Sequence, residues 1–139
     1  MIFVEANVFL RALVRPATPR DQGWARDAAE LFRAVGANEE EMTTSDAVLA
    51  EVAFILASPR QYGVAPADIA ARLKPILTLR GCKAPQKAVW LRALDIYASS
   101  TNLGFVDALS VSYAERPGVV LASFDSDFDA VPGLTRWRP

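Results

Sequence analysis

The sequence predicts an α/β fold of three layers, in which a central parallel sheet of four to five short strands is flanked by helices. Short apolar runs have the length of buried strands, and longer segments with apolar residues at helical spacing separate them. Strands that alternate with helices predict a parallel sheet wrapped by helices. The chain of 139 residues suits a single domain over residues 1–139, since most domains contain about 100–150 residues.

The predicted strands are short and rich in apolar or β-branched residues. The first begins almost at the N-terminus and ends at Glu5. A later strand follows Pro117-Gly118, which ends the helix before it. The predicted strands are residues 2–4, 42–44, 119–122 and 134–137.

Helical spacing, prolines and capping residues set the predicted helices. Asn7 is a suitable N-cap for the first helix, and a proline stops that helix. Ser45 or Asp46 caps the third helix, and capping residues at 99–102 precede the last one. We expect the aromatic residues of the fifth helix to be core or dimer contacts, with Trp90 a candidate contact in a dimer. The predicted helices are residues 8–15, 24–36, 47–58, 66–77, 85–97 and 103–114.

Composition excludes several classes of site. The net charge is −1 and the pI is near 5.4, so a nucleic acid would have to be bound by a local patch or through metal ions rather than by bulk charge. His is absent, which removes the usual general base and His metal sites. The single Cys82 cannot form an internal disulfide, which favours a reducing cytoplasm. We expect no membrane association, because no apolar run is long enough to span a bilayer and no signal peptide is visible.

Four carboxylates occupy comparable places in the predicted fold. Glu5 follows the first strand, Glu51 lies on the helix after the second strand, Asp107 starts the last helix, and Asp125 follows the strand at 119–122. In a parallel sheet with right-handed crossovers these places can share one edge. Four carboxylates without a basic partner repel one another, so we expect a divalent cation among them. Oxygen ligands without His or thiolate favour Mg²⁺ or Mn²⁺.

Several of these carboxylates also have a simpler interpretation. Glu51 sits at the margin of the apolar face of its helix and can be a boundary residue. Asp107 in a first helical turn is favoured by the helix dipole, although a carboxylate in so apolar a segment costs several kcal/mol unless it is paired or binds a metal. Of the two aspartates after Asp125, Asp127 is close enough in sequence to join such a site through water, and Asp129 is a candidate surface residue or turn cap.

Four short motifs follow one another over almost the whole chain. They are Phe3-Val4-Glu5-Ala6-Asn7-Val8-Phe9-Leu10-Arg11, Ala50-Glu51-Val52, Phe105-Val106-Asp107-Ala108-Leu109, and Ala122-Ser123-Phe124-Asp125-Ser126-Asp127-Phe128 followed by Pro132-Gly133. In these motifs and their order the chain resembles a PIN domain, and specifically the toxin nuclease of VapBC-type toxin–antitoxin pairs.

The resemblance implies a metal-dependent endoribonuclease, commonly a homodimer, that a small antitoxin protein holds inactive. It implies an acidic quartet around one or two Mg²⁺ or Mn²⁺ ions, made of Glu5, Glu51, Asp107 and Asp125. Two polar residues, Asn7 and Ser123, would orient these ligands. Asp127 stands where many relatives carry a further acid, so it is the candidate fifth member of the set, placed just outside the four ligands. Arg11 and Arg15 on the first helix are candidates for local RNA contacts, or else ordinary surface arginines.

One motif departs from the family pattern. The family ordinarily has Asp followed by Thr or Ser at the end of the first strand, where this chain has Glu5-Ala6. Glu reaches one methylene further and the hydroxyl is missing, and an octahedral Mg²⁺ site is sensitive to such shifts. A PIN-fold RNA- or protein-binding module with weakened or no catalysis is therefore the alternative function. A haloacid-dehalogenase-like phosphatase is a second alternative, although the paired aspartates which that family needs after the first strand are missing.

Overall fold

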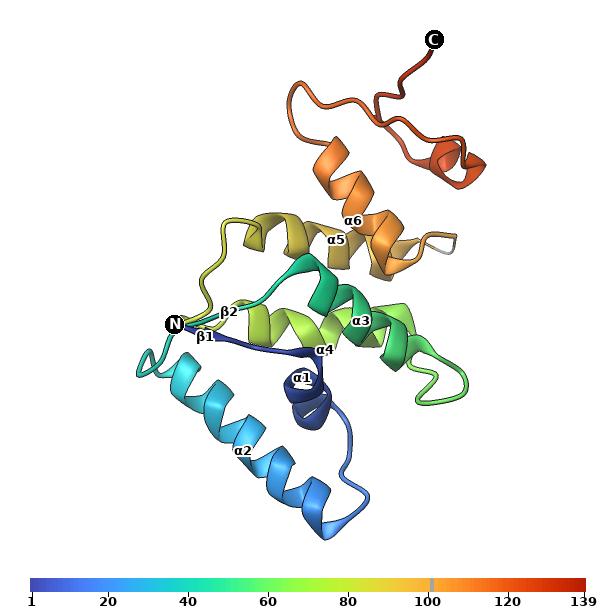
Figure 1. Ribbon diagram of the computed structural model, residues 1–139. Coiled ribbons are helices and arrows are strands. Elements are labelled where there is room, and N and C mark those ends of the chain that lie inside the picture. The colour runs from blue at the N-terminus through green and yellow to red at the C-terminus, as the bar shows by residue number, and fades with distance from the viewer. Residues whose placement is uncertain (101) are drawn as a thin grey trace.

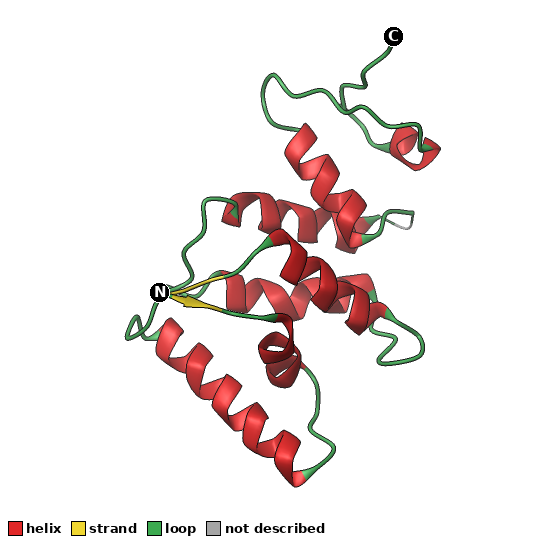
Figure 2. Cartoon of the chain, in the orientation of Figure 1, coloured by secondary structure: helices red, strands yellow, loops and turns green. Residues whose placement is uncertain are grey.

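The computed structural model describes residues 1–100 and 102–139, and it shows a mixed α/β chain dominated by helices (Figure 1). Two short strands lie at one side of the helices (Figure 2). No helix in these described ranges is both long and apolar enough to cross a membrane. The elements in chain order are β1 (Ile2–Phe3), α1 (Ala6–Leu13), α2 (Pro19–Gly36), β2 (Met42–Thr43), α3 (Asp46–Ala57), α4 (Pro66–Leu77), α5 (Lys87–Ser99), α6 (Phe105–Ala114) and the 3₁₀ helix η1 (Ser126–Ala130).

The sheet consists of β1 and β2, which pair in parallel with Ile2 opposite Met42 and Phe3 opposite Thr43. On the far side of β2, the backbone of residues 81–83 makes two hydrogen bonds of 2.8 Å with Met42. The described residues hold only these two strands. The α/β class and the parallel pairing therefore agree with the sequence, whereas the sheet is smaller than the predicted four to five strands.

The two predicted C-terminal strands account for most of this difference. Residues 119–122 and 134–137 are extended, and they pair with each other only at Leu121 and Arg136 in an isolated parallel bridge. An apolar run becomes part of a sheet only when its backbone reaches a neighbouring strand. Neither run pairs with β1.

The helix starts follow local capping signals, with one correction. Glu5, not Asn7, is the N-cap of α1, because its carboxylate accepts the N–H of Ala6 at 3.1 Å. Ser45 caps α3 as predicted, by accepting the N–H of Val48 at 3.2 Å. Each cap satisfies a backbone donor that the first helical turn leaves without a partner.

Three further helices begin at residues other than those predicted, among them α5, which starts at Lys87 rather than at Pro85. Thr18 caps α2, so this helix starts at Pro19 rather than near residue 24. Gly104 is the N-cap of α6 and has no side chain to accept a hydrogen bond. Of the predicted capping residues at 99–102, Thr101 lies outside the described residues.

One cluster of buried apolar side chains connects the strands with helices α1 to α6. Phe9, Leu56 and Leu94 in this cluster have no exposed surface. Trp90 is 1% exposed, and its indole N–H donates to the carboxylate of Asp46. Trp90 is therefore a core residue, which is the first of the two predicted alternatives, and it is too deeply buried to be a dimer contact.

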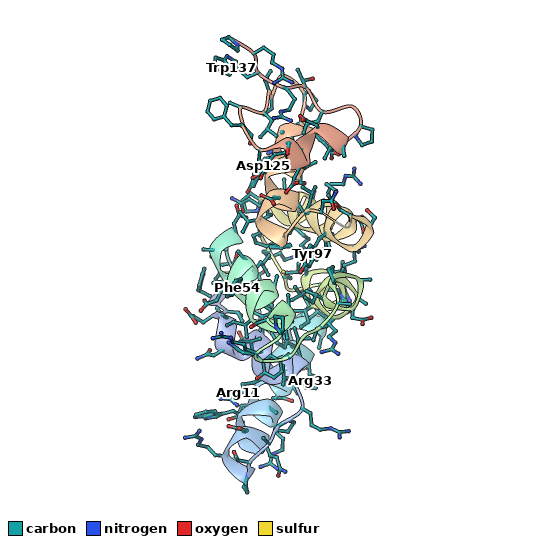
Figure 3. The ribbon with its side chains drawn as sticks, turned by 90° about the vertical axis from the view of Figure 1, so that its right-hand side faces the viewer. Arg11, Arg33, Phe54, Tyr97, Asp125 and Trp137 are labelled. Carbon is teal, nitrogen blue, oxygen red and sulfur yellow. The ribbon has the colours of Figure 1, made fainter. Side chains whose placement is uncertain are left out.

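Residues 117–139, which we call the C-terminal segment, leave the end of α6 and lie at one end of the molecule (Figure 1, Figure 3). The segment buries Phe128. It exposes four large apolar side chains: Val119, Val120, Phe124 and Trp137. Much of the apolar surface of the segment therefore faces solvent.

Candidate metal centre

The carboxyl end of β1 presents Glu5 at the start of α1. Buried Thr44 donates its hydroxyl to the carbonyl of Val4 at 2.9 Å, which fixes the end of the strand against the start of α3. One carboxylate oxygen of Glu5 accepts the N–H of Ala6 as the helix cap. Because Glu5 is exposed, its other oxygen is open to a cation.

Glu51 and Asp107 lie on two helices that are in contact with each other, α3 and α6. Helix α3 packs against both α1 and α6, so it joins the elements that carry Glu5, Glu51 and Asp107. Glu51 is exposed, and Asp107 is half-buried in the first turn of α6. The fold therefore brings together the elements that bear three of the four predicted ligands.

Asp125 lies in the C-terminal segment, close to η1 (Figure 3). Its carboxylate accepts the N–H of Asp127 at 2.8 Å, and its own N–H donates to the hydroxyl of Ser123 at 3.1 Å. Arg136 donates to the carbonyl of Ser123 at 2.8 Å and pairs with Asp129 at 2.9 Å. Asp125 is thus held in a well-connected turn, on a segment that lies apart from β1 (Figure 1).

The four predicted ligands do not form one cluster in this conformation. Within residues 1–100 and 102–139, no three acidic or cysteine side chains are grouped closely enough to hold a metal ion. Asp125 is clearly displaced, since it is carried by a segment that does not pair with β1. The assignment of the acidic quartet stays a prediction.

The predicted ligands share one electrostatic property: none of them pairs with Lys or Arg in the part of the chain that the structure describes. Six other acidic side chains do form such pairs: Asp21, Glu30, Glu39, Asp95, Glu115 and Asp129. In one of these pairs, a hydrogen bond from Arg33 holds the pKa of Glu30 below its usual range. Carboxylates free of such pairs keep their charge for a cation, and a donor set made only of oxygens fits Mg²⁺ or Mn²⁺.

The predicted orienting residues differ in what they contact. Asn7 is exposed and lines a groove of about 380 Å³ between α1 and α2, and no hydrogen bond joins it to Glu5 in the described residues. Ser123 holds the backbone N–H of Asp125 rather than its carboxylate. Asp127 is exposed two residues further on. The roles of these residues toward a metal stay predictions.

Arg11 and Arg15 also differ. Arg11 forms a 2.9 Å ion pair with Asp21, and its guanidinium lies 4.7 Å from the ring centroid of Trp24. Arg15 is exposed and makes no ion pair within the described ranges. Arg15 is therefore the better placed of the two to contact a phosphate, because Arg11 would first have to leave Asp21.

Two polar residues that position the helices were not recognised in the sequence. Thr44 holds the end of β1, as described above. Asp46 accepts hydrogen bonds from the indole of Trp90 and from the hydroxyl of Tyr113, the latter at 2.7 Å, and so connects α3 with α5 and α6. Burial, together with Asp46, raises the pKa of Tyr113. These partners lie 44 and 67 residues from Asp46 along the chain, so the only local signal was a possible helix cap.

Comparison with known protein families gives a match over nearly the whole chain. The family model described as PIN domain matches residues 2–134. A comparison with curated proteins gives no match. The matched range includes Glu5, Glu51, Asp107 and Asp125, and also most of the C-terminal segment.

Proposed function

Since the chain belongs to the PIN domain family, whose members are generally metal-dependent nucleases, we propose that it is an endoribonuclease that depends on Mg²⁺ or Mn²⁺. We further propose that it is the VapC-like toxin of a type II toxin–antitoxin pair, a homodimer that acts in the cytoplasm and is held inactive by a small antitoxin protein. The family match sets aside the haloacid-dehalogenase-like alternative.

One observation carries the proposal. Carboxylates free of ion pairs lie at the carboxyl end of β1, where Glu5 caps α1, on α3, which packs against α1 and carries Glu51, and on α6, which packs against α3 and carries Asp107. In open parallel sheets, ligands bind beyond the carboxyl ends of the strands. Acidic side chains that no protein cation neutralises there favour a bound divalent ion.

The proposed chemistry divides between the metal and the chain. Glu5, Glu51, Asp107 and Asp125 would hold a divalent ion, which would supply an activated water and stabilise the leaving oxygen of a scissile phosphate. Thr44 fixes the strand end that presents Glu5. Arg15 contacts a phosphate outside the metal site, because its guanidinium has no ion pair in the described chain. No His is needed for this hydrolysis.

The alternative is a PIN-fold module that binds RNA or protein with weak or no catalysis. It is favoured by the contact between Glu5 and Ala6, since one oxygen of the Glu5 carboxylate is engaged as a helix cap. Ala6 also has no hydroxyl that could orient a ligand. A strictly binding module would retain RNA without cleaving it.

Incubation with structured RNA, with Mn²⁺ or with EDTA, tests the enzymatic proposal. We expect cleavage that EDTA abolishes and that Asp107→Asn lowers about 100-fold or more, because a ligand is lost. Asp68→Asn is the matched control, since Asp68 is exposed and forms no ion pair in the described residues; its cleavage rate should equal that of the wild type. Cleavage that persists in EDTA would contradict the mechanism, and binding without cleavage would support the alternative.

The toxin assignment has its own test. A short open reading frame beside the gene should encode the antitoxin, and co-expression should yield a complex in which RNA cleavage is suppressed. Full cleavage by the co-purified pair would contradict the assignment without affecting the nuclease proposal.

A further inference from the structure

The edge of β1 that faces away from β2 is open. The N–H groups of Ile2 and Val4 bond to carbonyls on the β2 side. In a parallel pair only alternate residues bond to a given neighbour, so the backbone groups of Phe3 point to the opposite side, where no strand of the described chain pairs. The Phe3 side chain is 57% exposed. An open edge beside an exposed aromatic residue is a template for another strand.

The C-terminal segment carries a matching edge. Leu121 donates its N–H to the carbonyl of Thr135 at 2.9 Å and accepts the N–H of Trp137 at 2.8 Å. By the same alternation, the backbone groups of Val120 and Ala122 point away from that bridge, and they make no backbone hydrogen bond in the described residues. The run 119–122 is therefore an apolar strand with one free side.

The two free edges are complementary. In a parallel register with Phe3 opposite Leu121, the N–H of Phe3 would reach the carbonyl of Val120, and the carbonyl of Phe3 would reach the N–H of Ala122. We propose that the C-terminal segment of one copy of this chain adds to β1 of a second copy, and that the exchange is reciprocal, giving a segment-swapped homodimer.

The turn at the base of the segment favours a second copy over the same chain. Val119 donates its N–H to the carbonyl of Arg116 at 3.1 Å, which closes a turn with Pro117 and Gly118 at its corners. Gly118 has φ +79°, the value that a type II turn requires at this corner. This closed turn directs the segment away from the chain's own β1 (Figure 1), so docking on that strand would need the turn to open.

The C-terminal segment is held together by its own contacts, as expected of a unit that docks on another chain. Its two extended runs are joined by the bridge at Leu121, and Arg136 ties them to Ser123 and Asp129. The segment is thus ordered before it docks, which limits the entropy lost on association. Residues 117–139, exchanged in both directions, approach the roughly 20–30 residues per partner of a stable interface.

The exchange has a consequence for the metal centre, which rests on the proposed function. With Phe3 opposite Leu121, Glu5 of one copy lies opposite Ser123 of the other, and Asp125 follows just beyond the carboxyl end of β1. Each acidic quartet would then combine Glu5, Glu51 and Asp107 from one copy with Asp125 from the other. This would explain why Asp125 lies apart from β1 within a single chain.

Disulfide trapping between chains tests the exchange without relying on activity. Phe3→Cys and Leu121→Cys proteins are unfolded together, refolded and oxidised. On a denaturing gel without reductant we expect a band at twice the chain mass of 15.1 kDa, and this band should disappear when a reductant is added. The pair Ile2→Cys and Val120→Cys, on the opposite face of the strands, should do the same if Leu121→Cys impairs folding. Phe54→Cys mixed with Leu121→Cys is the matched control, since Phe54 is 75% exposed on α3 and should not link.

The double variant Phe3→Cys/Leu121→Cys separates the two arrangements directly. A swapped dimer gives a linked band at twice the chain mass, whereas docking on the same chain gives an internal link at the mass of one chain and overturns the proposal. The absence of any link in either cysteine pair also overturns it. Wild type should not link, because Cys82 has no exposed surface and burial raises the pKa of its thiol.

Recovery of RNA cleavage in mixed dimers is a second test, and its failure can be told apart from a failure of the nuclease proposal. Glu5→Gln and Asp125→Asn proteins, each inactive alone, should recover cleavage when refolded together, because one site of the mixed dimer then has all its ligands. Trapped dimers without cleavage in any sample would contradict the nuclease function and leave the exchange standing. Trapped dimers with active wild type but no recovery would contradict the delivery of Asp125 by the partner.

Discussion

The body of the molecule, residues 1–116, and the C-terminal segment, residues 117–139, bury their apolar residues to different degrees. Helices α1 to α6 of the body enclose a common core, to which the segment contributes Phe128, whereas Val119, Phe124 and Trp137 of the segment are exposed. A helix makes its backbone hydrogen bonds within itself, but a strand depends on a neighbour. The segment is thus anchored to the body through Phe128, but the free backbone edge of residues 119–122 has no partner strand in the described chain.

Replacing a tryptophan should change the free energy of unfolding far more in the body than in the C-terminal segment. Trp90→Ala in the body should lower the free energy of unfolding by about 3–5 kcal/mol, because a buried side chain is removed. Trp137→Ala in the segment should lower it by less than about 1 kcal/mol, since Trp137 is 51% exposed. Urea denaturation at one protein concentration measures both. Equal losses would show that the segment is packed as firmly as the body.

Replacing a glycine by alanine should change stability less, and in opposite directions in the two regions. Gly118→Ala should cost about 1 kcal/mol, because a side chain is strained at φ +79°, and the amide of Val119 should exchange hydrogen about five-fold faster. Gly23→Ala in α2 should have the opposite sign and stabilise by up to about 1 kcal/mol, since a Cβ there meets nothing within 4 Å. Unchanged exchange at Val119 in Gly118→Ala would show that the turn does not position the segment.

The smallest effect lies at the junction of the two regions. Arg92 on α5 binds Glu115 at the end of α6 at 2.7 Å, and this hydrogen bond lowers the pKa of Glu115. A carboxyl with a lowered pKa in the folded state stabilises the fold above its unfolded pKa, near 4.3, and this contribution is lost as the pH falls through the folded value. Solvent screening limits it to about 0.2–1 kcal/mol.

Glu115→Gln separates this contribution from other titrations. The variant should lose that amount at pH 7 and show a smaller fall in stability between pH 5 and pH 2 than wild type does, by urea denaturation at each pH. An identical pH dependence in both proteins would mean that the pair does not stabilise the junction.

The helical body was largely predictable because its signals are local. Pro66 begins α4, and Ser45 caps α3, as the sequence predicts. The first cap was misassigned to Asn7, because the Glu5 carboxylate can also bend back to the N–H of the residue after it. Helical spacing predicted Trp90 as a core or dimer contact but could not decide between them, since its partner Asp46 lies in a distant part of the chain.

The sequence could predict which acidic residues belong to the candidate site, but not whether the fold brings all of them together. The sequence places Glu5, Glu51 and Asp107 at a strand end and on helices, and in the structure α3, which carries Glu51, packs against both α1 and α6. The strand before Asp125 was predicted from its apolar residues, but pairing with β1 depends on an edge far away in sequence. Asp129 was expected at the surface, and it is exposed, although Arg136 neutralises it.

Calorimetric titration with Mn²⁺ tests most directly whether this chain holds a divalent metal with its unpaired carboxylates. We predict saturable binding to the wild type that is lost in Asp107→Asn and retained in Asp68→Asn. No binding to the wild type, or equal binding to the wild type and Asp107→Asn, would contradict the proposed metal centre.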